Sequence, residues 1–128
     1  MKLADTCVWV EVLADTPTGS RYRALLERSE ELIVPTLVQY ELRRWALREL
    51  GEDAADQIIA TTRNSQVTAL DEPIALHAAA LAQQFKLSSV DAMIYATALR
   101  HGATLVTCDR HFEDVPGVAY RAKVGARG

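Results

Sequence analysis

Short apolar runs alternate with longer segments of helical periodicity along almost the whole chain. This alternation constrains the fold most, because apolar runs separated by helices are typical of parallel strands joined by helical crossovers. We therefore predict an α/β fold. Its small, mainly parallel central sheet of about four or five strands is flanked by helices in three α/β/α layers.

The boundaries of the predicted elements follow from periodicity and from turn residues. Gly51 is a natural helix stop, and Pro73 is typical of a first helical turn. The expected strands are residues 2–5, 32–34, 66–70, 104–107 and a short last one at 118–120. The expected helices are residues 6–13, 36–50, 52–63, 73–85, 90–100 and one that begins at 18 or 20 and ends near 29.

The chain of 128 residues, 49% of them hydrophobic and 24% charged, has the composition of one globular domain. We predict a single domain over residues 1–128, with a basic and frayed tail at about 121–128. No segment approaches the ~18 consecutive apolar residues of a membrane span. Asp5 and Glu11 interrupt the N-terminal segment too early for a signal peptide. We therefore expect a cytoplasmic protein with no membrane partner and with reduced cysteines.

The formal net charge of −3 does not by itself indicate a nucleic-acid partner. Two bound divalent cations would reverse its sign, so the charge balance leaves a polyanionic substrate open. No spacing of cysteine and histidine matches a zinc site. We predict that His77, His101 and His111 are helix or loop residues rather than metal ligands.

Two aspartates follow predicted strands. Asp5 ends the first strand, and Asp109 follows the strand at 104–107. In an open parallel sheet, ligands bind just beyond the carboxyl ends of the strands. If these two strands are neighbours, the two carboxylates face each other across the same edge.

Two further acids lie on helices. Glu41 shares a predicted helix face with Val38 and Trp45, and a carboxylate on an apolar face is costly to bury unless it is paired or bound to a cation. Asp91 shares its face with Ile94 and further apolar residues. The two strand ends and the two helix faces together predict convergence of the four acids.

Each acid also has a purely structural interpretation. Asp5 and Asp109 can be helix caps or turn formers. The segment from Ser88 to Asp91 resembles a capping box with aspartate in place of glutamate. Glu41 can form a salt bridge with an arginine of its own helix. Four separate local roles, however, do not predict four carboxylates in one place.

Clustered carboxylates are suited to hard divalent cations. Mg²⁺ and Mn²⁺ prefer oxygen ligands, and a cluster of like charges is tolerable when such an ion neutralises it. Two ions about 4 Å apart can activate a water and hold a scissile phosphate, so no serine, cysteine or histidine nucleophile is needed. This chemistry fits a sequence without a recognisable catalytic triad.

The order of these motifs resembles that of the PIN-domain ribonucleases, and most closely the VapC toxins of type II toxin–antitoxin pairs. The resemblance covers essentially the whole chain. It rests on four segments: Asp5-Thr6 followed by Val-Trp, Glu41 in PTLVQYELRR, Asp91 in SSVDAMIYATA, and Asp109 in LVTCDRHF.

The resemblance implies a catalytic site and partners. The family's acidic quartet, its expected metal ligands, falls on Asp5, Glu41, Asp91 and Asp109, and its small hydroxyl residue falls on Thr107. One or two Mg²⁺ ions, or Mn²⁺, are the expected cofactors. The implied activity is that of an endoribonuclease toxin acting on tRNA or ribosomal RNA. The implied partners are RNA, a small VapB-like antitoxin and a second copy of the chain in a homodimer.

Two residues depart from the family pattern, and two other functions compete. Cys7 stands where asparagine or serine is frequent, and His111 stands where an additional acid is often found. A catalytically inactive PIN fold that binds RNA or protein is the alternative, but it would be expected to lose the quartet. A phosphoacceptor signalling domain needs an adjacent acidic pair, and none is present around Asp5.

Overall fold

The computed structural model describes residues 1–125, and its centre is a single sheet. All strand pairs are parallel, in the order β3-β2-β1-β4-β5. The strands are β1 (Lys2–Ala4), β2 (Leu32–Pro35), β3 (Gln66–Thr68), β4 (Thr104–Thr107) and β5 (Ala119–Tyr120). The predicted α/β class with a small parallel sheet is confirmed.

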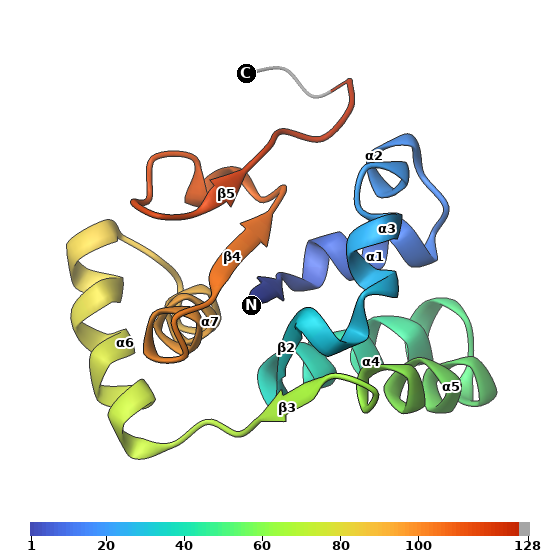
Figure 1. Cartoon of the computed structure of the whole chain (residues 1–128), viewed down its shortest axis with the longest axis horizontal. Coiled ribbons are helices and arrows are strands. Elements are labelled where there is room, and N and C mark those ends of the chain that lie inside the picture. Colours follow the sequence, from blue (N-terminus) through green and yellow to red (C-terminus); the bar gives the residue numbers. More distant parts are fainter. Residues whose placement is uncertain (126–128) are drawn as a thin grey trace.

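Helices flank the sheet, and Figure 1 shows α6 and α7 on one side of β4 and α1 to α3 on the other. None of the helices within residues 1–125 is long and apolar enough to cross a membrane. The α-helices are α1 (Thr6–Leu13), α2 (Pro17–Ser20), α3 (Arg23–Glu27), α4 (Thr36–Glu49), α5 (Glu52–Thr62), α6 (Glu72–Phe85) and α7 (Ser89–Arg100). The 3₁₀ helices are η1 (Ser29–Glu31) and η2 (Arg110–Phe112).

The strand order reverses between β1 and β4. From β1 the chain first proceeds outward to β2 and β3, and it returns to the other side of β1 with β4. Ala4 lies opposite Val106, and the N–H of Asp5 donates to the carbonyl of Val106 at 2.9 Å. Because helices leave such neighbouring strands in opposite directions, a crevice opens at the carboxyl ends of β1 and β4.

The helix α7 is the most deeply buried helix of the core. Its middle is built from small and apolar residues, and the exposed fractions of Ile94 and Ala96 are both 0%. Tyr95 packs edge-on against Phe112, and its hydroxyl donates to the carbonyl of Pro116 at 2.7 Å. This packing holds the middle of α7 against the segment that follows β4.

The predicted helix from 18 or 20 to 29 is wrong. The chain instead forms the two short helices α2 and α3 and then η1. Thr16, rather than Thr18 or Ser20, caps α2, because its hydroxyl accepts from the N–H of Gly19 at 3.0 Å. The break in the helix coincides with the close approach of Gly19 in α2 to the backbone of α1, which sequence periodicity does not indicate.

Replacing Gly19 with alanine is expected to destabilise the fold by about 3 kcal/mol. A Cβ atom at this position would lie 2.1 Å from the carbonyl oxygen of Glu11, so the backbone of α1 or α2 must shift. Urea unfolding measures the loss, with Ser20→Ala on the same helix as the matched control. Equal stability of the two variants would show that α2 does not rest on α1 as described.

The predicted fraying of the tail is wrong for residues 121–124. The N–H of Arg121 donates to the carbonyl of Thr107 at 3.1 Å, and Arg21 donates to the carbonyl of Ala122 at 2.5 Å. The N–H of Val124 donates to the hydroxyl of Thr18 at 2.8 Å. The segment is therefore held between β4 and α2. The rest of the predicted tail, residues 126–128, lies outside the described residues.

Candidate functional site

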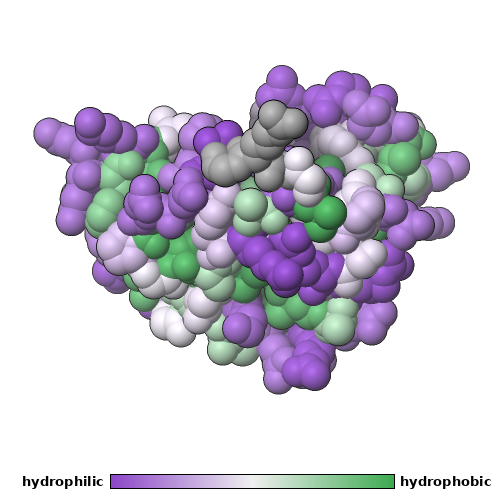
Figure 2. All heavy atoms as spheres, turned by 90° about the horizontal axis from the view of Figure 1, so that it is seen from above, coloured by the Kyte–Doolittle hydropathy of each residue, from purple (hydrophilic) through white to green (hydrophobic). Residues whose placement is uncertain are grey.

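The four acids that the sequence singled out line one cavity at the carboxyl edge of the sheet. Asp5, Glu41, Asp91 and Asp109 come from the end of β1, from α4, from the first turn of α7 and from the segment after β4. The cavity has a volume of about 280 Å³. Figure 2, a view from above onto this side of the molecule, shows hydrophilic atoms gathered between more apolar areas.

Asp5 is the most deeply buried of the four, with an exposed fraction of 4%. One carboxylate oxygen accepts from the N–H of Thr6 at 2.8 Å, so the residue caps α1 as its structural interpretation predicted. The other oxygen accepts from the hydroxyl of Thr107 at 2.8 Å. The cap and the site are therefore compatible roles of one side chain.

Thr107 joins the two strand ends. Its fully buried hydroxyl donates to Asp5 and accepts from the N–H of Asp109 at 3.0 Å. The thiol of Cys7 lies 3.3 Å from the same hydroxyl and 3.7 Å from the second carboxylate oxygen of Asp5. Thr107 thus orients two of the acids without itself being exposed to the cavity.

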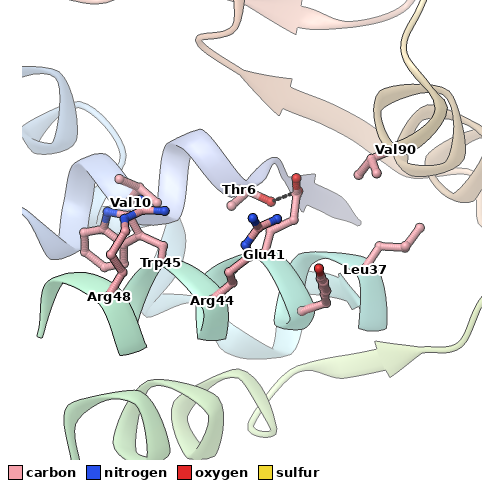
Figure 3. Close-up of a pocket in the computed structure, with 9 residues that line it drawn as sticks. Thr6, Val10, Leu37, Glu41, Arg44, Trp45, Arg48 and Val90 are labelled. Atoms are coloured by element: carbon pink, nitrogen blue, oxygen red, sulfur yellow. Dashed lines mark hydrogen bonds between the residues drawn. The ribbon is translucent and has the colours of Figure 1, made fainter. Parts of the chain in front are cut away.

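Glu41 is not on the buried face of α4, contrary to the prediction. The buried residues of this helix are Val38, Leu42 and Ala46, which repeat every four positions, whereas Glu41 is only half-buried beside them. Its carboxylate accepts from the hydroxyl of Thr6 at 2.6 Å, as Figure 3 shows. This contact with α1, rather than an arginine of its own helix, orients Glu41 toward the strand ends.

Replacing Thr6 with valine is expected to weaken divalent-cation binding about tenfold, because outer hydrogen-bond partners typically contribute that much to metal affinity. Valine has nearly the same shape but cannot hold the carboxylate of Glu41. Calorimetric titration with MnCl₂ measures the effect, and Thr6→Ser, which keeps the hydroxyl, is the matched control. Unchanged affinity in the valine variant would exclude this role of Thr6.

Asp91 and Asp109 meet beside a histidine. The side chains of Asp91 and Asp109 are 17% and 30% exposed, so both acids are partly buried. The predicted cap of α7 is present, since the hydroxyl of Ser88 accepts from the N–H of Asp91 at 3.4 Å. Nδ1 of His111 lies 3.1 Å from Asp109 and 3.7 Å from Asp91. His111, predicted to be a helix or loop residue rather than a ligand, lies in η2 and adjoins both acids.

The cluster shifts the titration of two of its members. Burial raises the pKa of Asp5 well above its ordinary value, and nearby Cys7 and Asp91 raise it further. Burial also raises the pKa of Asp91, followed by the charge of Asp109. Both shifts mean that the metal-free site resists full ionisation. A cation would relieve this repulsion, and the four carboxylates supply the oxygen ligands that Mg²⁺ and Mn²⁺ prefer.

A larger groove of about 570 Å³ continues from the acidic cavity along α4. The two share Thr6, Val10 and Glu41. Figure 3 shows Arg44, Trp45 and Arg48 along the groove, with the two arginines carried by successive turns of α4. The groove therefore combines cationic groups with an aromatic side chain next to the acids.

Lys123 lines the acidic cavity together with the four acids. The hydrogen bonds that anchor the tail lie on both sides of it, at Ala122 and Val124. Basic composition alone could not indicate this position, because the anchor depends on Thr18 and Arg21, which are distant in sequence. Three arginines of the chain pair with acids outside the quartet, in the pairs Arg23–Asp15, Arg43–Asp56 and Arg48–Glu49.

Among the solved structures with the same fold are three from bacteria. One is a toxin–antitoxin complex from Klebsiella pneumoniae, at 24% identity and TM-score 0.77, covering 92% of this chain and 95% of the other. Another is VapC20 of Mycobacterium tuberculosis, described as a sarcin–ricin loop cleaving toxin, at 20% identity and TM-score 0.76, covering 94% and 99%. FitAcB from Neisseria gonorrhoeae matches at 22% identity and TM-score 0.71, covering 98% and 100%.

No curated protein matches the sequence. The family model of the PIN domain, however, matches residues 2–118, which include every strand end and helix that contributes an acid to the cavity. Because the match extends over nearly the whole chain, and because the parallel sheet and the acidic cavity agree with it, the chain belongs to the PIN-domain family.

Proposed function

We propose that this protein is a Mg²⁺- or Mn²⁺-dependent endoribonuclease and the toxin component of a toxin–antitoxin pair. The observation that carries the proposal is the convergence of Asp5, Glu41, Asp91 and Asp109 in one cavity. Only a function that uses concentrated negative charge gives these residues a common role. An RNA- or protein-binding domain without catalysis would have no use for this costly arrangement.

The donor set fits hard divalent cations, and all four carboxylates are candidates to hold them. A bound cation would supply Lewis acidity and an activated water for phosphodiester hydrolysis. The protein supplies the positions of the ligands. Thr6 holds Glu41, while Thr107 holds Asp5 and the backbone of Asp109.

The groove along α4 is the proposed path of the RNA strand. Arg44 would contact a phosphate, and Trp45 at the groove wall would contact a base. Lys123 at the acidic cavity would hold the phosphate nearest the cleaved bond. Single-stranded or loop RNA suits such an open groove, because its bases and backbone are both accessible.

The toxin assignment rests on likeness. The similar structures are described as a toxin–antitoxin complex and as a toxin that cleaves the sarcin–ricin loop. By analogy, we propose a VapB-like antitoxin as the partner of this chain, a homodimer as its assembly, the cytoplasm as its location and a tRNA or ribosomal RNA as its target.

The nuclease proposal is tested with purified protein and total bacterial RNA. We expect cleavage in MgCl₂ or MnCl₂, no cleavage in EDTA, and new ends that carry 5′-phosphate groups when they are sequenced. RNA binding without cleavage, by a folded protein that also binds Mn²⁺, would favour the non-catalytic binding module. Cleavage that persists in EDTA would exclude the metal-dependent mechanism.

Replacing Lys123 with methionine is expected to raise the KM for RNA about tenfold, because one phosphate contact is lost. The slope of log KM against the logarithm of the salt concentration should also fall by about 0.7. Binding of Mn²⁺ is expected to remain intact. Lys2→Met, at the opposite end of β1, is the matched control. A KM and a salt dependence equal to those of the control would show that Lys123 does not contact the RNA.

A further inference from the structure

His111 completes a three-residue cluster with Asp91 and Asp109. One ligand atom from each of the three residues lies within 4.8 Å of the other two. The nearest distances from Nδ1 of His111 are 3.1 Å to Oδ1 of Asp109 and 3.7 Å to Oδ2 of Asp91. One ring nitrogen thus faces carboxylates from two separate elements, α7 and the segment after β4.

The backbone after β4 sets this position. The N–H of His111 donates to Oδ1 of Asp109 at 2.9 Å, and the N–H of Asp109 donates to the hydroxyl of Thr107 at 3.0 Å. Asp109 therefore caps η2, which carries His111 in its first turn. The ring itself is 75% exposed, so it is directed to the acids by the turn and by electrostatic attraction rather than by packing.

An ion pair is the simplest interpretation of these contacts, but it contributes little at such exposure. A neutral imidazole at the same place offers a nitrogen lone pair next to two carboxylate oxygens. This is a mixed ligand set, whereas Mg²⁺ favours oxygen ligands and near-ideal octahedral geometry. Mn²⁺ accepts imidazole more readily, and affinity for such mixed sites rises from Mn²⁺ along the first transition row.

We propose that His111 is a nitrogen ligand of the divalent cation and that it gives this site a preference for Mn²⁺ over Mg²⁺. The inference rests on the proposed metal-dependent function and names the residue that selects its ion. Thr107 and Asp109 act as the support that positions the ring.

Calorimetric titrations with MnCl₂ and with MgCl₂ test the preference. We expect the ratio of Mn²⁺ to Mg²⁺ affinity to fall about tenfold or more in His111→Asp, which restores an oxygen ligand, because Mn²⁺ loses its nitrogen donor. His101→Ala, which alters an exposed histidine at the end of α7, is the matched control and should keep the wild-type ratio. An unchanged ratio in His111→Asp would overturn the inference.

Pulsed electron paramagnetic resonance of the Mn²⁺-loaded protein tests ligation directly. We expect modulation from a coordinated histidine nitrogen in the wild type and in His101→Ala, and its loss in His111→Ala. Loaded wild-type protein without this modulation, or failure to bind Mn²⁺, would overturn the inference.

The RNA assay separates the two proposals. Cleavage that depends on a divalent cation, without nitrogen coordination, would leave the nuclease function standing and remove His111 as a ligand. Nitrogen coordination by a protein that cleaves no RNA would support the ligand assignment and count against the nuclease function.

Discussion

Asp91→Asn is expected to reduce metal-dependent RNA cleavage by about 10²- to 10³-fold while the protein remains folded. The substitution removes one negative charge from the cation site and keeps the size of the side chain. The capping contact at this turn uses the hydroxyl of Ser88 and the backbone N–H of residue 91, so α7 should still begin at Ser89. Because burial already disfavours the charged form of Asp91 and raises its pKa, loss of the charge should not destabilise the fold.

The measurement is a single-turnover cleavage rate in MnCl₂, with circular dichroism to verify folding. The control is Asp53→Asn, which changes an exposed acid in the first turn of α5 and lies outside the cavity. Its cleavage rate should equal that of the wild type. Full activity in a folded Asp91→Asn protein would exclude Asp91 from the mechanism.

Asp5→Asn is expected to have opposite effects on stability and on metal binding. At pH 8 the metal-free variant should have a higher free energy of unfolding than the metal-free wild type, since a buried charge with a raised pKa is removed. Asparagine can still cap α1, and its amide can donate to the hydroxyl of Thr107. Binding of Mn²⁺ should raise the free energy of unfolding of the wild type by about 2.7 kcal/mol at a Mn²⁺ concentration 100 times its Kd. The variant should lose most of this gain.

The pH dependence of this difference follows from the direction of the shift. The folded state holds the proton of Asp5 more tightly than the unfolded state, whose pKa is near the ordinary value of 3.8. Stability of the metal-free wild type is therefore lost as pH rises above 3.8, and the loss is complete above the raised folded pKa. The advantage of Asp5→Asn should accordingly be largest at pH 8 and shrink toward pH 4.

Thermal unfolding with and without MnCl₂, at several pH values, measures both effects. Glu11→Gln is a suitable control, because Glu11 also lines the cavity but stands outside the quartet. A variant Asp5→Asn that is less stable than the wild type at pH 8, in the absence of metal, would contradict the description of Asp5 as a buried and costly charge.

The order of the elements could be predicted from the sequence because each strand is a short apolar run and each long helix has a clear period. The sequence argument only assumed that β1 and β4 are neighbours, and the structure shows that they pair. The segment from Thr16 to Glu31 could not be predicted, since its two short helices depend on the close contact between Gly19 and α1. Local periodicity contains no information about such a contact.

Asp5 and Asp109 could be placed from the sequence because they follow strands, whereas helix periodicity put Glu41 on a face of α4 that is not the buried one. The contacts that support the acids could not be predicted. Thr6 and Glu41 are far apart in the chain, and their hydrogen bond depends on how α1 and α4 pack. The same is true of Lys123, which reaches the cavity only because α2 anchors the tail. The sequence placed His111 where the family often has a further acid, but its proximity to Asp91 depends on how α7 packs beside the turn after β4.

The most direct test of the four-carboxylate site is the anomalous difference map of crystals soaked in MnCl₂. A peak is expected in the acidic cavity, within bonding distance of at least two of Asp5, Glu41, Asp91 and Asp109. Manganese bound elsewhere, with the four carboxylates ordered and free of metal at saturating MnCl₂, would contradict the existence of the site and the metal-dependent nuclease that depends on it.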